Sequence, residues 1–105
     1  MEFRVAFQVS KLQSGKQKQT DVAGDSILLS NVDGKFYAIG NICTHAGCPL
    51  YGGLLKGKTI TCSCHGSQFD VTTGEVLRGP ADKPEPAYEV KIDGEDILID
   101  GKKAR

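Results

Sequence analysis

The chain contains no tryptophan, and its other aromatic residues are three Tyr and four Phe. It also has no excess charge of either sign: 13 Lys and Arg balance 13 Asp and Glu, so the formal net charge at pH 7 is zero. A protein without a basic field gains little from releasing the counterions of a polyanion. We therefore expect no nucleic acid among its partners.

Long apolar segments are missing as well. No run of apolar residues approaches the roughly 20 that span a bilayer, and residues 1–4 contain no apolar signal segment. No stretch has the 3.6-residue apolar period of an amphipathic helix, and no repeat of roughly 20 to 50 residues is present. These absences predict an all-β fold and a cytoplasmic chain without a membrane anchor.

What the chain does contain is alternating apolar residues, the pattern of half-buried strands. In residues 2–9 this pattern places every second residue from Phe3 to Val9 on one face. We expect a first strand there. The polar stretch that follows, residues 10–20, favours a solvated loop or an edge strand.

Two Asp-Gly pairs predict hairpins. Asp33-Gly34 lies between two β-rich segments, residues 25–32 and 35–39. A two-residue Asp-Gly loop is typical of a type I′ turn, because glycine tolerates a positive φ. The second pair, at residues 93–94, turns the chain between two further alternating segments and predicts a closing hairpin.

Residues 40–82 are rich in glycine and contain only short β-like runs, such as Thr59–Thr61. This composition predicts mostly loops around a fixed centre. The strands on either side of the segment most simply pair with one another in a small antiparallel barrel or sandwich. A chain of 105 residues has room for one domain. We therefore expect one domain, with a basal barrel of about residues 1–39 and 83–105 and residues 40–82 inserted at one end.

All four Cys and both His lie between Cys43 and His65. Random placement would gather six residues in that stretch with a probability on the order of one in ten thousand, so one local site uses them together. They form two groups, CTHAGCPL at residues 43–50 and CSCHGSQFD at residues 62–70. Each group holds two Cys and one His.

Three kinds of site compete for these residues. A tetrahedral zinc ion takes four ligands, commonly spaced C-x2–4-C or H-x3–5-H, whereas six candidates are present here. The pairs Cys43-x-His45 and Cys62-x-Cys64 are spaced more tightly than that. Two disulfides would leave both His unexplained. A [2Fe–2S] centre in which two His replace two Cys on one iron takes ligands of both kinds.

In their spacing these residues resemble the Rieske-type ferredoxin family, in which C-x-H is followed by C-x-x-H. The resemblance runs from Cys43 to Ala81 through Pro49-Leu50, Cys62, His65-Gly66, Phe69-Asp70, Thr73-Gly74 and Gly79-Pro80. It implies one [2Fe–2S] cluster per chain. Cys43 and Cys62 would hold the inner iron. His45 and His65 would hold the outer, solvent-facing iron.

The same resemblance implies roles for neighbouring residues. Cys48 and Cys64 would form a disulfide between the two ligand loops, and Gly79-Pro80 would lie in a third loop that covers the cluster. Ser67 would donate a hydrogen bond to a cluster sulfur. Cys48, Cys64 and Ser67 are features of the high-potential branch of the family.

These expectations describe a soluble one-electron carrier that works between redox protein partners and is not itself an enzyme. A phenol donor is missing at Phe69, where the high-potential branch commonly has Tyr. If both imidazoles face water, loss of their ring protons favours the oxidised form, so we expect the potential to fall as pH rises into the alkaline range. Two alternatives stay open: a ferredoxin component of a multi-chain oxygenase or reductase, and a zinc-stabilised binding module.

Overall fold

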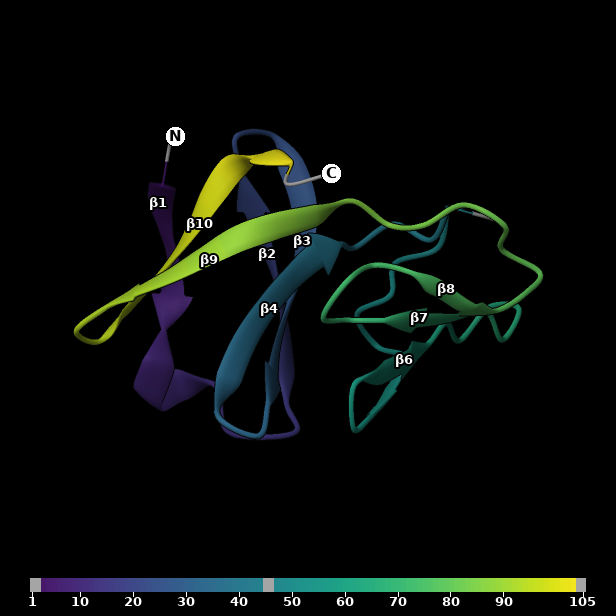
Figure 1. The fold of residues 1–105 in the computed structure, drawn as a ribbon, viewed down its shortest axis with the longest axis horizontal. Coiled ribbons are helices and arrows are strands. Elements are labelled where there is room, and N and C mark those ends of the chain that lie inside the picture. Colours follow the sequence, from purple (N-terminus) through teal and green to yellow (C-terminus); the bar gives the residue numbers. More distant parts are fainter. Residues whose placement is uncertain (1–2, 45–46, 104–105) are drawn as a thin grey trace.

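Two antiparallel β-sheets lie side by side in the computed structural model, which describes residues 3–44 and 47–103 (Figure 1). The strand order is β1-β10-β9-β4-β3-β2 in the larger sheet and β5-β6-β7-β8 in the smaller one. The bounds are β1 Phe3–Gln8, β2 Gln17–Val22, β3 Asp25–Val32, β4 Lys35–Gly40, β5 Leu54–Lys56, β6 Thr59–Thr61, β7 Gln68–Asp70, β8 Val76–Arg78, β9 Ala87–Asp93 and β10 Asp96–Lys103. A single 3-10 turn, η1 (Val9–Lys11), is the one helical element of the described residues. The predicted all-β class is confirmed.

The larger sheet curls into a nearly closed barrel. Its two end strands, β1 and β2, contact each other, and the Thr20 hydroxyl donates a hydrogen bond to the carbonyl oxygen of Ala6 across 3.4 Å. Closing a sheet on itself covers strand edges that would otherwise pair with other chains. The polar residues 10–20, which were predicted to be a loop or an edge strand, contain part of η1 and the start of the end strand β2.

Among the described residues, none of the helical structure has the length and apolar character of a membrane-spanning helix.

The two predicted hairpins are present, and they differ in their turns. Asp33 and Gly34 have φ values of 53° and 88°, which is the type I′ geometry expected between β3 and β4. In the closing hairpin Asp93 pairs with Asp96, so the loop is Gly94-Glu95. The predicted turn was one residue too early. Gly94, with φ 61°, takes the first loop position, where a type II′ turn favours glycine.

The strand predicted at residues 2–9 is β1, but its alternation is interrupted. Val5 pairs with Leu98 and Phe7 pairs with Ile97, so Ala6 is an extra residue on the β1 side. Such a bulge moves the following residues to the opposite face. Phe7 consequently packs on the barrel core, whereas Val5 is 61% exposed. The expectation that Phe3 to Val9 share one face was wrong for this reason.

β3 is buried on both faces, and this positions the second sheet. Ile27 and Leu29 lie in the barrel core, while Leu28, on the opposite face, packs with Ile39 in a second apolar core. The other buried members of this second core, here called the shared core, are Cys43, Leu50, Ile60, Cys62, Phe69, Val71 and Ala81. Residues 40–82 thus pack against the outside of the barrel wall through continuous apolar contact.

The segment 40–82 contains more regular structure than its glycine content predicted. Four strands of three residues each form the second sheet, and only β6, at Thr59–Thr61, was foreseen. Three residues are too few to display an alternating pattern in the sequence. Cys62, Cys64 and His65 lie in the loop between β6 and β7, whereas Cys43 and Cys48 lie in the segment between β4 and β5.

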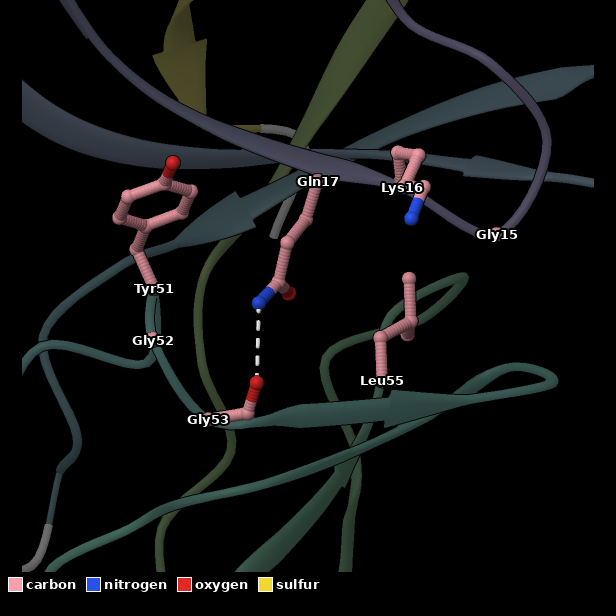
Figure 2. A pocket seen from close by; sticks show the side chains of 7 residues that line it. All are labelled: Gly15, Lys16, Gln17, Tyr51, Gly52, Gly53 and Leu55. Atoms are coloured by element: carbon pink, nitrogen blue, oxygen red, sulfur yellow. Dashed lines mark hydrogen bonds between the residues drawn. The ribbon is translucent and has the colours of Figure 1, made fainter.

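A hollow of about 350 Å³ separates the start of β2 from the chain leading into β5 (Figure 2). The Gln17 side-chain amide reaches across it and donates a hydrogen bond to the carbonyl oxygen of Gly53 at 3.1 Å. Its described lining residues include no Cys or His. The hollow therefore lies apart from the residues that the sequence analysis selected, and the Gln17 bond is a second link between the two sheets.

The bulge in β1 can be tested with two matched valine truncations. Val5→Ala should change the free energy of unfolding by no more than about 0.5 kcal/mol, because Val5 is largely exposed. Val22→Ala should cost roughly 1–3 kcal/mol, because Val22 is 3% exposed and lies in the barrel core. Thermal or denaturant unfolding measures both. Equal losses in the two variants would show that Val5 faces the core and that β1 has no bulge.

Candidate metal centre

Two loops of the second sheet region repeat the same backbone hydrogen bonds. We call residues 43–48 the first loop and residues 62–67 the second loop. In each, the N–H of the leading Cys bonds to the carbonyl oxygen five residues later, and the N–H of a Gly bonds back to the Cys carbonyl. The bonds are Cys43 N–H to Cys48 O (2.7 Å), Gly47 N–H to Cys43 O (2.9 Å), Cys62 N–H to Ser67 O (2.8 Å) and Gly66 N–H to Cys62 O (3.0 Å). The two leading cysteines therefore occupy equivalent positions.

Each loop turns through a glycine in the left-handed region. Gly47 has φ 72° and Gly66 has φ 79°. An L-amino acid with a side chain rarely adopts this conformation, and glycine adopts it without steric cost. The glycines that follow the His residues in the sequence are thus required by the shape of the two loops.

Cys43 and Cys62 are free thiols and both are buried, at 3% and 2% exposure. Both belong to the shared core. Two reduced thiols at equivalent positions of two loops, shielded from water, are suited to bind a metal as thiolates.

The other two cysteines, Cys48 and Cys64, form a disulfide with a Cα–Cα distance of 6.5 Å. This is the pair that the family resemblance implied. It joins the last residue of the first loop to the middle of the second loop. The covalent bond restricts how far the two loops can separate.

The structure describes one of the two histidines. His65 lies in the second loop and is exposed, as expected for a ligand that faces solvent. His45 lies outside the described residues. The exposure of residue 65 agrees with the expectation that both imidazole edges face water, and that expectation stays a prediction at both histidines.

Ser67 ends the second loop and is fully buried. Its hydroxyl oxygen accepts a hydrogen bond from the backbone N–H of Ala81 at 3.0 Å. A hydroxyl that accepts one hydrogen bond still has its own hydrogen to donate. Ala81 directly follows Gly79-Pro80, so this bond also holds the third loop against the second.

The donor set fits a two-iron centre. Cys43 and Cys62 supply two buried free thiols, and His65 supplies an exposed imidazole. A mixed-ligand [2Fe–2S] centre takes donors of both kinds, with two protein ligands on each iron.

Asp70 is the last residue of β7, which directly follows the second loop. Burial alone would raise the pKa of its carboxyl. Hydrogen bonds from the Thr72 hydroxyl (2.6 Å) and backbone N–H (2.8 Å), together with the Lys58 ammonium at 3.4 Å, nevertheless lower that pKa overall. The Asp70 carbonyl accepts the N–H of Gly74 at 2.7 Å. The turn at residues 70–74 is therefore built around Asp70.

Glu85 is a residue that the sequence analysis missed. It is 3% exposed, and its Oε2 atom accepts a hydrogen bond from the backbone N–H of Thr44, in the first loop, at 3.0 Å. Burial raises the pKa of Glu85 to about 7, and this hydrogen bond limits the rise. No sequence pattern marks it, because it is one acidic residue between two prolines in a polar stretch, 41 positions away from its partner.

Comparison with known proteins agrees with this geometry. Residues 2–95 match the Rieske [2Fe-2S] domain family. The biphenyl dioxygenase ferredoxin subunit of Pseudomonas sp. (strain KKS102) is 35% identical over 105 residues, which cover 99% of this chain and 96% of that protein. The ferredoxin component of the naphthalene 1,2-dioxygenase system of Pseudomonas aeruginosa is 39% identical over 79 residues, covering 75% of this chain and 76% of that protein.

Solved structures give the same result. The ferredoxin of carbazole 1,9a-dioxygenase from Nocardioides aromaticivorans IC177 has a TM-score of 0.92 and 32% identity, over 97% of this chain and 100% of that one. A chain in the complex of reduced oxygenase and oxidized ferredoxin in carbazole 1,9a-dioxygenase has a TM-score of 0.93 and 28% identity, over 98% and 96% of the two chains.

The chain belongs to the Rieske [2Fe-2S] domain family. Its cofactor is a [2Fe–2S] cluster, and it carries electrons between redox proteins without being a catalyst itself. The predicted family, cofactor and type of activity are confirmed, and the disulfide is consistent with the high-potential branch. The zinc-module alternative is not supported.

The buried carboxyl gives a pH-dependent prediction for Glu85→Gln. The ordinary pKa of Glu is 4.5, so between pH 4.5 and about 7 the unfolded chain loses a proton that the folded protein keeps. The contribution of Glu85 to stability is complete below pH 4.5 and is lost as pH rises through about 7. The variant should therefore gain stability relative to wild type at pH 8 compared with pH 5, by up to about 3 kcal/mol.

Melting temperatures of the cluster-loaded wild type and variant at the two pH values measure this gain. Glu89→Gln, at an exposed position of β9, is the matched control and should show no such difference. A gain of the same size at pH 5 and pH 8 would mean that Glu85 titrates normally.

Proposed function

We propose that this chain is a one-electron carrier of the high-potential Rieske type, with Cys43 and Cys62 as ligands of one iron and His45 and His65 as ligands of the other. The observation that carries the proposal is the pair of equivalent loops, each leading with a buried free thiol and joined by the Cys48–Cys64 disulfide. When bound, the cluster supplies a single-electron couple whose potential depends on its ligands and on hydrogen bonds to its sulfurs.

The cysteines and the histidine would have different roles at the cluster. Burial of Cys43 and Cys62 in the shared core keeps water away from the thiolates. The exposed position of His65 offers a redox partner a point of approach at the surface. Replacing thiolates by neutral imidazoles leaves a less negative site, which favours acceptance of an electron.

Ser67 and the third loop complete this proposal. Ser67 would donate its remaining hydroxyl hydrogen to a cluster sulfur and so stabilise the reduced state. The Ala81 N–H to Ser67 bond supports a covering role for Gly79 and Pro80, since it holds their segment next to the second loop.

A second candidate is more specific: the chain serves as the ferredoxin component of a dioxygenase system, between a reductase and an oxygenase. It is favoured by the similarity along 99% of this chain to a biphenyl dioxygenase ferredoxin subunit. The midpoint potential distinguishes the two candidates, because ferredoxins of oxygenases belong to the low end of the Rieske range. We also propose a cytoplasmic location, which fractionation of cells producing the tagged chain would test.

We further propose the division into a basal barrel of about residues 1–39 and 83–105 and a cluster-binding part of about residues 40–82. The second sheet and both ligand loops lie within residues 40–82, which supports this division. Because the shared core draws on β3 and β4 as well, the cluster-binding part depends on the barrel for its packing.

Removal of one proposed ligand tests the assignment. His65→Ala should abolish the Rieske absorption and EPR signature, because one iron then loses one of its two protein ligands. Ser63→Ala, at an exposed position of the same loop, is the control and should keep both signatures. An unaltered Rieske spectrum in His65→Ala would remove His65 from the ligand set.

Ser67→Ala should lower the midpoint potential while leaving the ligands in place. A net hydrogen bond of about 1 kcal/mol corresponds to roughly 40 mV for a one-electron couple, so we expect a fall of that order. Ser63→Ala should leave the potential unchanged. A redox titration followed by visible circular dichroism measures both variants. If Ser67→Ala keeps the wild-type potential, backbone amides and burial do the tuning instead.

A further inference from the structure

The chain crosses between the two sheets twice, and Glu85 lies where these crossings meet. The outgoing crossing begins at Gly40, the end of β4, and the returning segment between β8 and β9 passes beside it (Figure 1). The Gly40 N–H donates to the carbonyl oxygen of Pro86 at 2.8 Å, and the Glu85 N–H donates to that of Gly74 at 2.8 Å. These two backbone hydrogen bonds hold the chain at residue 85 in place independently of its side chain.

The side chain of Glu85 reaches the first loop. Its Oε2 atom accepts the N–H of Thr44 at 3.0 Å. That N–H belongs to the peptide bond that leads out of Cys43. The Thr44 hydroxyl donates to the carbonyl oxygen of Lys83 at 2.6 Å, so the returning segment holds Thr44 by two bonds. A carboxyl at this place fixes the orientation of the peptide that directly follows a proposed ligand.

Packing alone does not account for a carboxyl at this position. Glu85 is 3% exposed and forms no ion pair with any described residue. Glu85 contributes to the raised pKa of Tyr88, about 12, whose main cause is burial, and the Tyr88 hydroxyl donates to Asp25 at 3.3 Å. An apolar side chain would be buried here at lower cost.

The neighbouring backbone leaves space for the carboxyl. A Cβ added at Gly40 would lie 2.6 Å from Glu85 Oε1 and 2.9 Å from Pro86 Cδ. Contacts this close require one of the groups to shift. Glycine at position 40 therefore allows Glu85 to reach Thr44.

We propose that Glu85 is a positioning residue of the metal centre, whose carboxyl holds the Thr44 peptide and thereby keeps the first loop in the conformation that binds the cluster. This inference rests on the proposed function, in which Cys43 is a ligand. Glu85 acts on the cluster only through Thr44 and the loop.

The test compares Glu85→Leu with Glu85→Gln in the cluster-loaded protein. Leucine removes the acceptor, which leaves the Thr44 N–H without its partner, whereas the glutamine side chain still offers an oxygen. We expect Glu85→Leu to lose its cluster to a chelator about tenfold faster than wild type and to show an altered EPR spectrum. Glu85→Gln should keep the wild-type rate and spectrum.

Controls separate this role from general effects. Glu89→Leu and Glu89→Gln, at an exposed position, should both match wild type. If Glu85→Leu does not accumulate with its cluster, Gly40→Ala takes its place, because the added Cβ would lie too close to both the Glu85 carboxyl and the Pro86 ring and so disturbs the contact with Thr44 without removing the carboxyl. That variant should also lose the cluster faster than wild type.

Three results would overturn the inference: a wild-type rate and spectrum in Glu85→Leu, cluster loss in Glu85→Gln as fast as in Glu85→Leu, or, where Gly40→Ala is used, an unchanged rate in that variant. The proposed function fails in a different way, through a wild-type protein that lacks the Rieske spectrum. The two failures are therefore distinguishable in the same set of measurements.

Discussion

The metal centre depends on keeping two separate loops in a fixed relation to one another. The Cys48–Cys64 disulfide joins them directly. The shared core then seats both leading cysteines against the barrel wall, through Leu28 of β3 and its neighbours. Because cores are close-packed and resist local displacement, the thiols of Cys43 and Cys62 are held by the same contacts that stabilise the fold.

The two kinds of proposed ligand differ in burial. The cysteines lie in the shared core, whereas His65 is exposed on the second loop. A redox site of this kind is protected from water on one side and accessible to a partner on the other. The disulfide and the buried Ser67 favour the high-potential branch, while the similarity to dioxygenase ferredoxins favours the low end of the range. The potential therefore carries more information about this protein than its fold does.

Local chemistry made much of the fold predictable from the sequence. The Asp33-Gly34 turn was predicted because its dihedral angles depend on the residues in it. The bulge at Ala6 was not, since it depends on how β1 pairs with β10. The strands β5, β7 and β8 escaped prediction because each has only three residues. Their pairing is fixed by packing on the barrel, which a periodic pattern does not report.

The candidate site was likewise predictable from the sequence only in part. The spacing of Cys and His indicated the proposed ligands, and the family resemblance implied the Cys48–Cys64 pair that the structure contains. The supporting contacts could not be predicted. Glu85 reaches Thr44 only because the chain returns past β4, and the bond from Ala81 to Ser67 likewise joins segments that are 14 residues apart. Such contacts follow from tertiary structure and leave no local pattern.

The central claim is a mixed-ligand [2Fe–2S] centre held by these two loops. A redox titration of the purified wild-type protein, followed by EPR, tests it most directly. The account predicts a single one-electron couple within the Rieske range, about −150 to +300 mV, with the EPR signature of a cluster that has two His ligands. A couple near −400 mV, the value of plant-type clusters with four Cys ligands, or a protein that contains zinc and no iron would contradict it.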